Sequence, residues 1–175
     1  IHGGILGRRE VHAEEAQASG ISWIDVVIVN LYPFEQTVLK DGVDLETAIE
    51  QIDIGGPTMI RAAAKNHKDV TVVCDPADYA ALLEELPAPS KAFRRRLALK
   101  AFQHTAFYDG IISSWLHREF LAEDSDIPAF PQNISLPLRK VSTLRYGENP
   151  HQESAFYIDA LPNGRTLRDL HQHQG

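Results

Sequence analysis

Two glycines between an acid and a lysine are the residues of this sequence best suited to chemistry. Gly55 and Gly56 directly precede a predicted helix, so backbone N–H groups at its positive N-terminus can point at a ligand that approaches closely. Asp53 comes before the glycines and Lys65 follows at about two helical turns, an arrangement suited to proton transfer. The alternative is structural, with Asp53 stabilising the turn and Lys65 and Asn66 ending an ordinary helix.

A carboxamide and a phenol form a second candidate site. Asn30 ends the segment 24–30 and Tyr32 follows it; the segment is rich in β-branched residues and is typical of a parallel strand buried on both faces. Ligands of open α/β sheets bind where such strands end, and both side chains can orient a planar amide. Tyr32 is equally well interpreted as an ordinary aromatic residue at the edge of the core.

The other ionisable residues give weaker indications, and we predict no metal site. The eight histidines are scattered. The pair His171 and His173 has no cysteine nearby and favours a surface strand or turn. Cys74 is the single cysteine, which excludes an internal disulfide. The arginines at 94–96 spread around a helix and favour a solvated face.

The predicted elements alternate between strands and helices. Strands are expected at 24–30 and 70–74. Helices are expected at 44–52 with Asp44 as N-cap, from Pro57 to about Asn66, and from Asp75 to about Leu86. This order predicts an α/β layered sheet. A long helix should follow over about 90–120, with a break at Gly110. The acidic, proline-containing segment 122–137 is expected to be a linker, and the strand-and-turn pattern of 138–175 the start of a second domain.

Composition excludes two classes of partner. The chain has 175 residues, 43% of them hydrophobic, and a formal charge of −7. The sequence pI of about 5.6 argues against a nucleic-acid-binding face, and a phosphorylated ligand would need local donors against this mean charge. No apolar run approaches the roughly 20 residues that span a bilayer. Because we find no secretory signal, we expect a cytoplasmic location. The first residue is Ile1 rather than methionine, so we expect an upstream portion to be missing.

Five segments, in this order along the chain, resemble signature segments of one family: 1–6 (IHGGIL), 29–34 (VNLYPF), 52–56 (IDIGG), 61–67 (RAAAKNH) and 144–152 (LRYGENPHQ). The family is the bifunctional phosphoribosylaminoimidazolecarboxamide (AICAR) formyltransferase / IMP cyclohydrolase. The resemblance implies a Rossmann-type, methylglyoxal-synthase-like three-layer parallel sheet, here incomplete, in a cyclohydrolase domain over 1–121. It also implies a linker over 122–137 and the start of a cytidine-deaminase-like formyltransferase domain over 138–175.

The resemblance also implies the chemistry of purine biosynthesis. The carboxamide nitrogen of formyl-AICAR attacks its formyl carbon, and water is lost to give IMP. The catalytic residues would be Lys65 as proton donor and acceptor, Asp53 acting on the carboxamide, and Tyr32 orienting it. Residues that resemble the family's nucleotide-binding positions are Val29, Asn30, Ile54, Gly55, Gly56 and, for AICAR in the formyltransferase region, Arg145 and Tyr146.

The remaining implications concern cosubstrates and partners. The cyclohydrolase needs no cofactor, and the formyltransferase uses 10-formyltetrahydrofolate as formyl donor. The family is a homodimer whose ligands are small purine nucleotides. The family's upstream phosphate loop and Lys-Thr-Leu-His-Pro segment are not in this sequence, nor are the residues of formyl transfer. We therefore expect little or no activity from this chain alone, and the alternative is a non-catalytic purine-nucleotide-binding module.

Overall fold

A computed structural model describes residues 1–162, 164 and 173, which form two compact units. The first unit comprises Ile1–Pro33 and Ile49–Ala106, and the second comprises the described residues of Phe34–Ala48 and Phe107–Gly175. The elements, in chain order, are α1 (His2–Leu6), α2 (Arg9–Ala18), β1 (Val26–Ile28), α3 (Phe34–Val38), α4 (Leu45–Glu50), α5 (Gly55–Lys65), β2 (Thr71–Val73), the 3₁₀ turn η1 (Pro76–Asp78), α6 (Tyr79–Glu85), α7 (Lys91–Glu123), β3 (Leu138–Leu144) and β4 (Ser154–Asp159).

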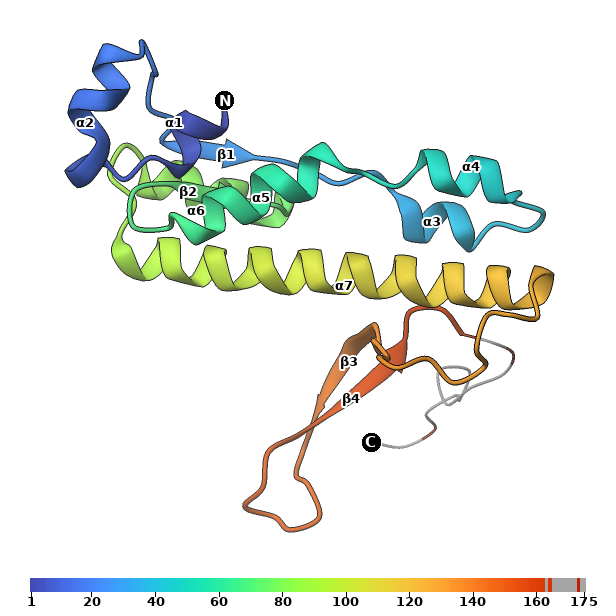
Figure 1. The fold of residues 1–175 in the computed structure, drawn as a ribbon. Coiled ribbons are helices and arrows are strands. Elements are labelled where there is room, and N and C mark those ends of the chain that lie inside the picture. Colours follow the sequence, from blue (N-terminus) through green and yellow to red (C-terminus); the bar gives the residue numbers. More distant parts are fainter. Residues whose placement is uncertain (163, 165–172, 174–175) are drawn as a thin grey trace. The chain divides into compact units, whose positions relative to one another are not determined.

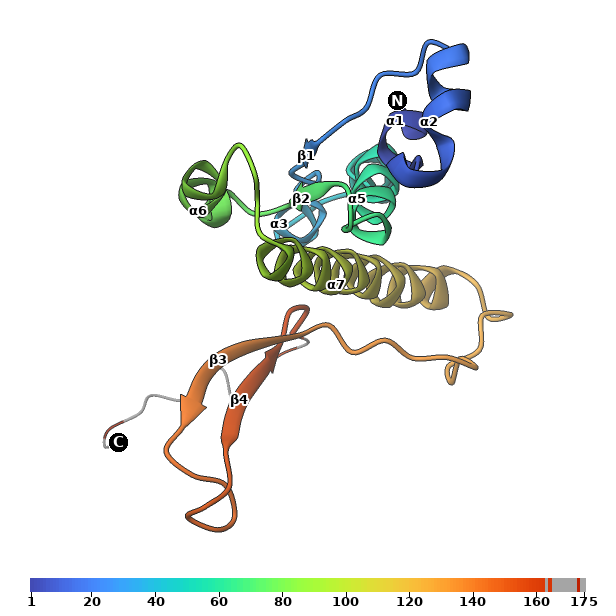
Figure 2. The same ribbon diagram turned by 90° about the vertical axis from the view of Figure 1, so that its left-hand side faces the viewer.

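The first unit is built on a parallel pair of strands, as the sequence predicts. Val26 pairs with Thr71, Val27 with Val72 and Ile28 with Val73 (Figure 1). Viewed along the strands, α5 lies on one side of the pair and α6 on the other, which gives three layers (Figure 2). β2 is buried throughout, but Ile28 of β1 is 50% exposed, so the prediction that this strand is buried on both faces is wrong.

The core of the first unit lies where α5, both strands and the first turns of α7 meet. α5 contributes Ile60 and a run of three alanines, because small side chains allow the helix to pack closely on the strands. Val72 and Val73 contribute from β2, and Leu97 and Ala101 from α7, all of them at most 1% exposed. This core holds the start of α5, and with it Asp53 and the two glycines, against the end of β1.

Most predicted helices are present, with changed limits. Asp44 caps α4 as expected, since its Oδ1 accepts the Thr47 N–H at 2.7 Å. α5 begins two residues before Pro57. α7 runs unbroken through Gly110, so the predicted break is wrong. A single glycine costs a helix only about 1 kcal/mol, and residues on either side of it pack: Tyr108, Ile111 and Trp115 are all at least nine-tenths buried.

The second unit contains an aromatic cluster and a hairpin. Phe34 of α3 is fully buried, and its ring meets the edge of Trp115 at 5.7 Å between centroids. β3 and β4 pair antiparallel, in agreement with the strand-and-turn pattern predicted after residue 137. Residues 124–137 form neither helix nor strand. His171 lies outside the described residues, so the surface interpretation of the His171 and His173 pair has no structural description. No helix among the described residues is long and apolar enough to cross a membrane.

Candidate functional site

The carboxyl ends of the two parallel strands place several polar residues at one edge of the sheet. The Val29 N–H donates to the carbonyl of Val73 at 3.0 Å, so pairing continues one residue past β1. Asn30 therefore leaves the sheet beside the turn that follows β2. Its Nδ2 donates to the hydroxyl of Tyr79, the first residue of α6, at 3.1 Å. The predicted binding residues Val29 and Asn30 thus lie at the edge where α/β proteins bind ligands.

Asp53 joins this edge to the start of α5. Its Oδ1 accepts the Gly56 N–H at 2.7 Å, and its Oδ2 accepts the Tyr32 N–H at 3.3 Å. The carboxylate therefore caps the helix and fixes the backbone that follows β1. Hydrogen bonds to a charged acceptor are roughly twice as strong as neutral ones. The structural alternative, in which Asp53 stabilises the turn, describes its contacts correctly and is compatible with a role toward a ligand.

The two glycines differ in what surrounds them. A methyl group on Gly55 would meet no heavy atom within 4 Å, so the surface above Gly55 is open. A methyl group on Gly56 would lie 2.6 Å from Asp53 Oδ2 and 2.7 Å from Leu31 Cδ2. Gly56 is therefore required for the close approach of Asp53, whereas Gly55 leaves backbone accessible.

The predicted residues around this opening are accessible to a ligand. Tyr32 is 56% exposed and Ile54 is 75% exposed, and Asn30 is exposed as well. Tyr32 is thus not the core-edge aromatic of the alternative interpretation. Asp53 links the backbone of Tyr32 to the glycines, and Asn30 lies two residues before Tyr32. We call residues 30–32 and 53–56 together the Asp53 turn. A groove of about 390 Å³ elsewhere, lined by residues such as Glu84, Phe93 and Arg96, includes none of the predicted site residues.

Lys65 does not belong to this surface. α5 has 11 residues, so Lys65 follows Asp53 by more than three helical turns rather than two. The helix rises about 15 Å from Gly55 to Lys65. It runs from the carboxyl edge of the sheet back to the edge where β2 begins. The prediction that about two helical turns separate Asp53 and Lys65 is therefore wrong, and the role of Lys65 as proton donor and acceptor stays a prediction.

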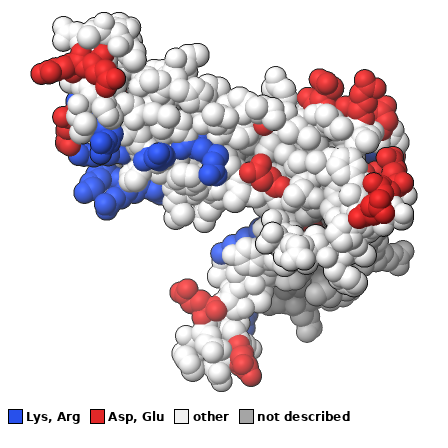
Figure 3. Space-filling view, viewed as in Figure 1, with Lys and Arg blue, Asp and Glu red and all other residues white. Residues whose placement is uncertain are grey.

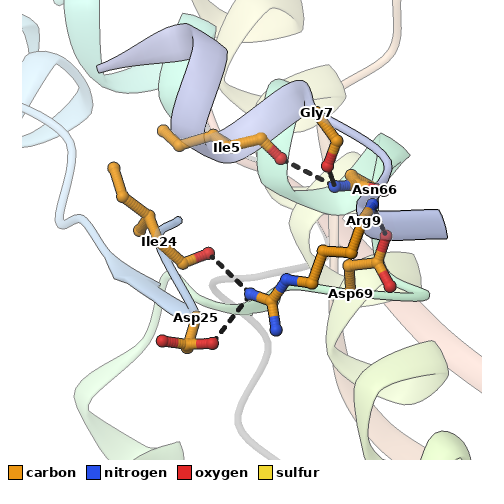
Figure 4. A network of polar contacts seen from close by, with 7 residues as sticks. All are labelled: Ile5, Gly7, Arg9, Ile24, Asp25, Asn66 and Asp69. Atoms are coloured by element: carbon orange, nitrogen blue, oxygen red, sulfur yellow. Dashed lines mark hydrogen bonds and ion pairs between the residues drawn. The ribbon is translucent and has the colours of Figure 1, made fainter. Parts of the chain in front are cut away.

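The Lys65 end of α5 is fastened to α1 instead. The next residue, Asn66, is buried, and its Nδ2 donates to the carbonyls of Ile5 at 2.7 Å and Gly7 at 3.1 Å (Figure 4). Beside it, Arg9 bonds Asp25 at 2.7 Å. The motif segments 1–6 and 61–67 therefore meet at this end, and Lys and Arg side chains gather over α5 and the start of α7 (Figure 3).

Comparison with known proteins identifies the family. A family model described as "AICARFT/IMPCHase bienzyme" matches residues 63–175, and one described as "MGS-like domain" matches residues 2–58. The chain belongs to the AICARFT/IMPCHase bienzyme family. Its first unit is accordingly an incomplete Rossmann-type, MGS-like α/β fold.

Two known proteins are similar to this chain. The bifunctional purine biosynthesis protein PurH of Persephonella marina (strain DSM 14350 / EX-H1) is 53% identical over 166 residues, which cover 92% of this chain and 31% of that protein. The crystal structure of ForH has a TM-score of 0.57 and 36% sequence identity, over 65% of this chain and 61% of that chain. The chain thus spans about a third of the length of the PurH relative.

Arg145 and Tyr146, the predicted AICAR-binding residues of this family, lie in the second unit. They follow β3 in the hairpin loop, where both are exposed. The loop is held by the Gly147 N–H, which donates to the Gln152 carbonyl at 2.8 Å, and by the Asn149 N–H, which donates to Gln152 Oε1 at 2.9 Å. The segment LRYGENPHQ therefore forms a closed turn that presents Arg145 and Tyr146 at its beginning.

Sequence reasoning missed an ionic cluster that joins the turn between β2 and α6 to α7. Lys100 Nζ lies 2.6 Å from both Asp75 Oδ2 and Asp78 Oδ2, and Arg96 lies 3.5 Å from Asp78. The hydrogen bond from Lys100 lowers the pKa of Asp75, and the two carboxylates raise the pKa of Lys100 against the opposing effect of burial. The spacing of Arg96 and Lys100 by four residues on a helix was an available signal, but their partners are more than 15 residues away in sequence.

A histidine and a cysteine lie next to this cluster. Burial lowers the pKa of His104, and among the described residues its Nε2 is a buried atom without a hydrogen-bond partner. Burial also raises the pKa of the Cys74 thiol, so this cysteine is held in its neutral, unreactive form. We assign neither residue a chemical role.

Proposed function

We propose that the Asp53 turn is the nucleotide-binding part of an IMP cyclohydrolase site, acting in purine biosynthesis. Family membership supports the reaction class, and the contacts of Asp53 support the location. The observation that carries most weight is that one carboxylate joins the end of β1 to the start of α5. It thereby fixes the backbone of Tyr32, two residues after Asn30, to the glycine turn.

The geometry suits an intramolecular ring closure. In formyl-AICAR both reacting groups are on one molecule, so much of the rate enhancement comes from holding the carboxamide nitrogen near the formyl carbon. The C–N bond forms as the nitrogen attacks, and the formyl oxygen leaves as water after proton transfer. We assign orientation of the carboxamide to Tyr32 and Asp53, contact with the base to Ile54, Gly55 and Gly56, and contact with the nucleotide to Val29 and Asn30.

Lys65 enters this proposal differently from the way the sequence suggested. By resemblance it is the proton donor and acceptor, but it lies at the opposite end of α5 from Asp53. A lysine extends about 6 Å from its Cα, which does not bridge a helix of about 15 Å. The proposed site therefore contains no Asp53–Lys65 pair from one chain.

The domain limits, cosubstrate, ligands and oligomeric state that we propose are those of the family. We propose a cyclohydrolase domain over 1–121, a linker over 122–137, and the start of a cytidine-deaminase-like formyltransferase domain from 138 that uses 10-formyltetrahydrofolate. The cyclohydrolase site takes no cofactor. The ligands are AICAR, formyl-AICAR and IMP, and the protein forms a homodimer in the cytoplasm without nucleic-acid or membrane partners.

A second candidate function is a purine-nucleotide-binding module without catalysis. The separation of Lys65 from Asp53 favours it, because a binding site does not need an acid–base pair. The two candidates differ in turnover, so the chain should be joined to the flanking segments of the Persephonella marina relative and supplied with formyl-AICAR.

The experiment compares wild type, Asp53→Asn and Lys65→Ala for IMP affinity by calorimetry and for conversion of formyl-AICAR to IMP. The cyclohydrolase proposal expects turnover by wild type and a loss of about 100-fold in Asp53→Asn, because misplacing a reacting group by about 1 Å costs on that order. Tight IMP binding without turnover would establish the binding module. Asp53→Asn with unchanged affinity and turnover would refute the proposed location.

A further inference from the structure

Tyr79 contacts a candidate nucleotide-binding residue from outside the segments that resemble the family. Its hydroxyl accepts a hydrogen from Asn30 Nδ2 at 3.1 Å, across 49 residues of sequence. An asparagine side chain ends in one acceptor oxygen and one NH₂ donor group. Because the NH₂ group is turned toward α6, the orientation of the whole carboxamide is fixed. Within the described part of the chain the Asn30 oxygen accepts no hydrogen bond.

The hydrogen bond to Tyr79 restrains the Asn30 side chain, which is otherwise at the surface. The residue is exposed, and a free side chain at this position would lose rotational freedom when a ligand binds. Tyr79, by contrast, is half-buried and packs against the hydrophobic core of the first unit. The hydrogen bond therefore transfers the rigidity of the core to an exposed polar group at the edge of the sheet.

The position of Tyr79 is set by the ionic cluster that precedes it. Asp78, the residue before it, is 6% exposed and is bound by Lys100 at 2.6 Å. Asp75 accepts the Ala77 N–H at 2.9 Å and is bound by the same lysine. A buried carboxylate must keep its partner, since an unpaired buried charge is costly. The turn between β2 and α6 is thus fastened to α7, and Tyr79 cannot move away from Asn30 without disturbing it.

We propose that Tyr79 is a positioning residue for nucleotide recognition. Its hydroxyl holds the NH₂ group of Asn30, which leaves the carboxamide oxygen as the group that accepts a hydrogen bond from a purine nucleotide. Tyr79 has this role toward a ligand only if the Asp53 turn is the nucleotide site proposed above. The matching ligand group is an N–H donor, which both the carboxamide of AICAR and the ring of IMP provide.

The first test needs no ligand and uses the 175-residue chain. Tyr79→Phe removes the hydroxyl and keeps the ring, and Tyr157→Phe serves as a matched control because Tyr157 is 51% exposed on β4. The side-chain amide protons of Asn30 are observed by heteronuclear NMR. We expect them to shift and to exchange with water about 2- to 10-fold faster in Tyr79→Phe, the range expected for one net hydrogen bond. Unchanged Asn30 signals would overturn the positioning role.

The second test measures IMP affinity in wild type, Tyr79→Phe, Asn30→Ala and the double variant. We expect Tyr79→Phe to raise the Kd by about 2- to 10-fold and to add nothing in the Asn30→Ala background, because the hydroxyl acts only through Asn30. Independent, additive effects would instead mark a general structural role and overturn the inference. These affinities are measured on the chain joined to the flanking segments of the Persephonella marina relative. If that wild-type protein binds no IMP, the proposed function is refuted, while the NMR measurement still decides whether Tyr79 holds Asn30.

Discussion

The two neighbouring glycines of the Asp53 turn should respond oppositely to the same substitution. Alanine is favoured over glycine in a helix by about 0.5–1 kcal/mol. Gly55→Ala adds its methyl group where no heavy atom lies within 4 Å, so it should stabilise the chain by up to that amount. Gly56→Ala adds the same group 2.6 Å from Asp53 Oδ2 and 2.7 Å from Leu31 Cδ2. Both atoms must then move.

The cost at Gly56 has two parts. Overfilling a packed site costs about 1–3 kcal/mol. Displacing Asp53 also weakens its bonds to the N–H groups of Gly56 and Tyr32, and each hydrogen bond to a charged group contributes about 1.5–3 kcal/mol. Both bonds can lengthen without breaking, and the gain in helix propensity offsets part of the loss. We therefore expect Gly56→Ala to lower the free energy of unfolding by about 2–4 kcal/mol.

Urea unfolding and hydrogen exchange measure this difference. With a denaturant slope of about 2 kcal/mol per molar urea, the midpoint of Gly56→Ala should fall by about 1–2 M. That of Gly55→Ala should be unchanged or slightly higher. The chain forms two units, so we also follow hydrogen exchange of the Tyr32 amide, which reports on the Asp53 contact itself. This exchange should accelerate only in Gly56→Ala. Equal midpoints for the two variants, with the Tyr32 amide equally protected in both, would refute the role assigned to Asp53.

Three further outcomes are expected. Lys100→Met should lower the free energy of unfolding by about 2 kcal/mol because it leaves the nearly buried Asp78 poorly paired. As a control, Lys68→Met breaks the salt bridge to Glu10, whose two side chains are 66% and 71% exposed, and should cost less than about 1 kcal/mol. Equal urea midpoints for Lys100→Met and Lys68→Met would contradict this difference. Burial lowers the pKa of His104, so below its ordinary value of 6.5 the unfolded chain takes up a proton that the folded chain resists. The urea midpoint of the wild type should therefore fall as the pH drops below neutrality, and His104→Gln should reduce this fall. If the midpoints of the two proteins change with pH by the same amount, the assignment to His104 is refuted. Asn66→Ala should cost about 1–3 kcal/mol by removing the donor to two carbonyls, and exchange should accelerate first in α1, whereas uniform acceleration would contradict a local role.

Features governed by neighbouring residues could be predicted from the sequence. The β-branched runs identified both parallel strands, and Asp44 identified the start of α4, because these signals act within a few residues. The predicted break at Gly110 is absent because packing along α7 outweighs the intrinsic cost of one glycine. The short helix α1 carries no comparable local signal, and it depends on Asn66, about 60 residues away.

In the candidate site, too, the sequence predicts the features set by neighbouring residues and not the contacts between distant ones. The sequence placed Asn30 at the end of a strand and Asp53 before a helix, as the structure has them, and Asp53 contacts the backbone of Tyr32, two residues after Asn30. It could not supply Tyr79, because the contact that matters joins residues 49 positions apart. Asp53 and Lys65 have side chains suited to proton transfer, but the 11-residue helix between them has to be considered before one site is assigned to both.

The geometry of α5 leaves few ways for Lys65 and Asp53 to act on one nucleotide. The last turn of α5 would have to unwind, which breaks the two hydrogen bonds of Asn66, or a second copy of the chain would have to supply the lysine. Mixing Asp53→Asn and Lys65→Ala chains distinguishes these routes. In a site shared between copies, a mixed dimer contains one intact site, so mixing restores function that neither variant has alone. In a site completed within one chain, each protomer still lacks one group, and mixing restores nothing.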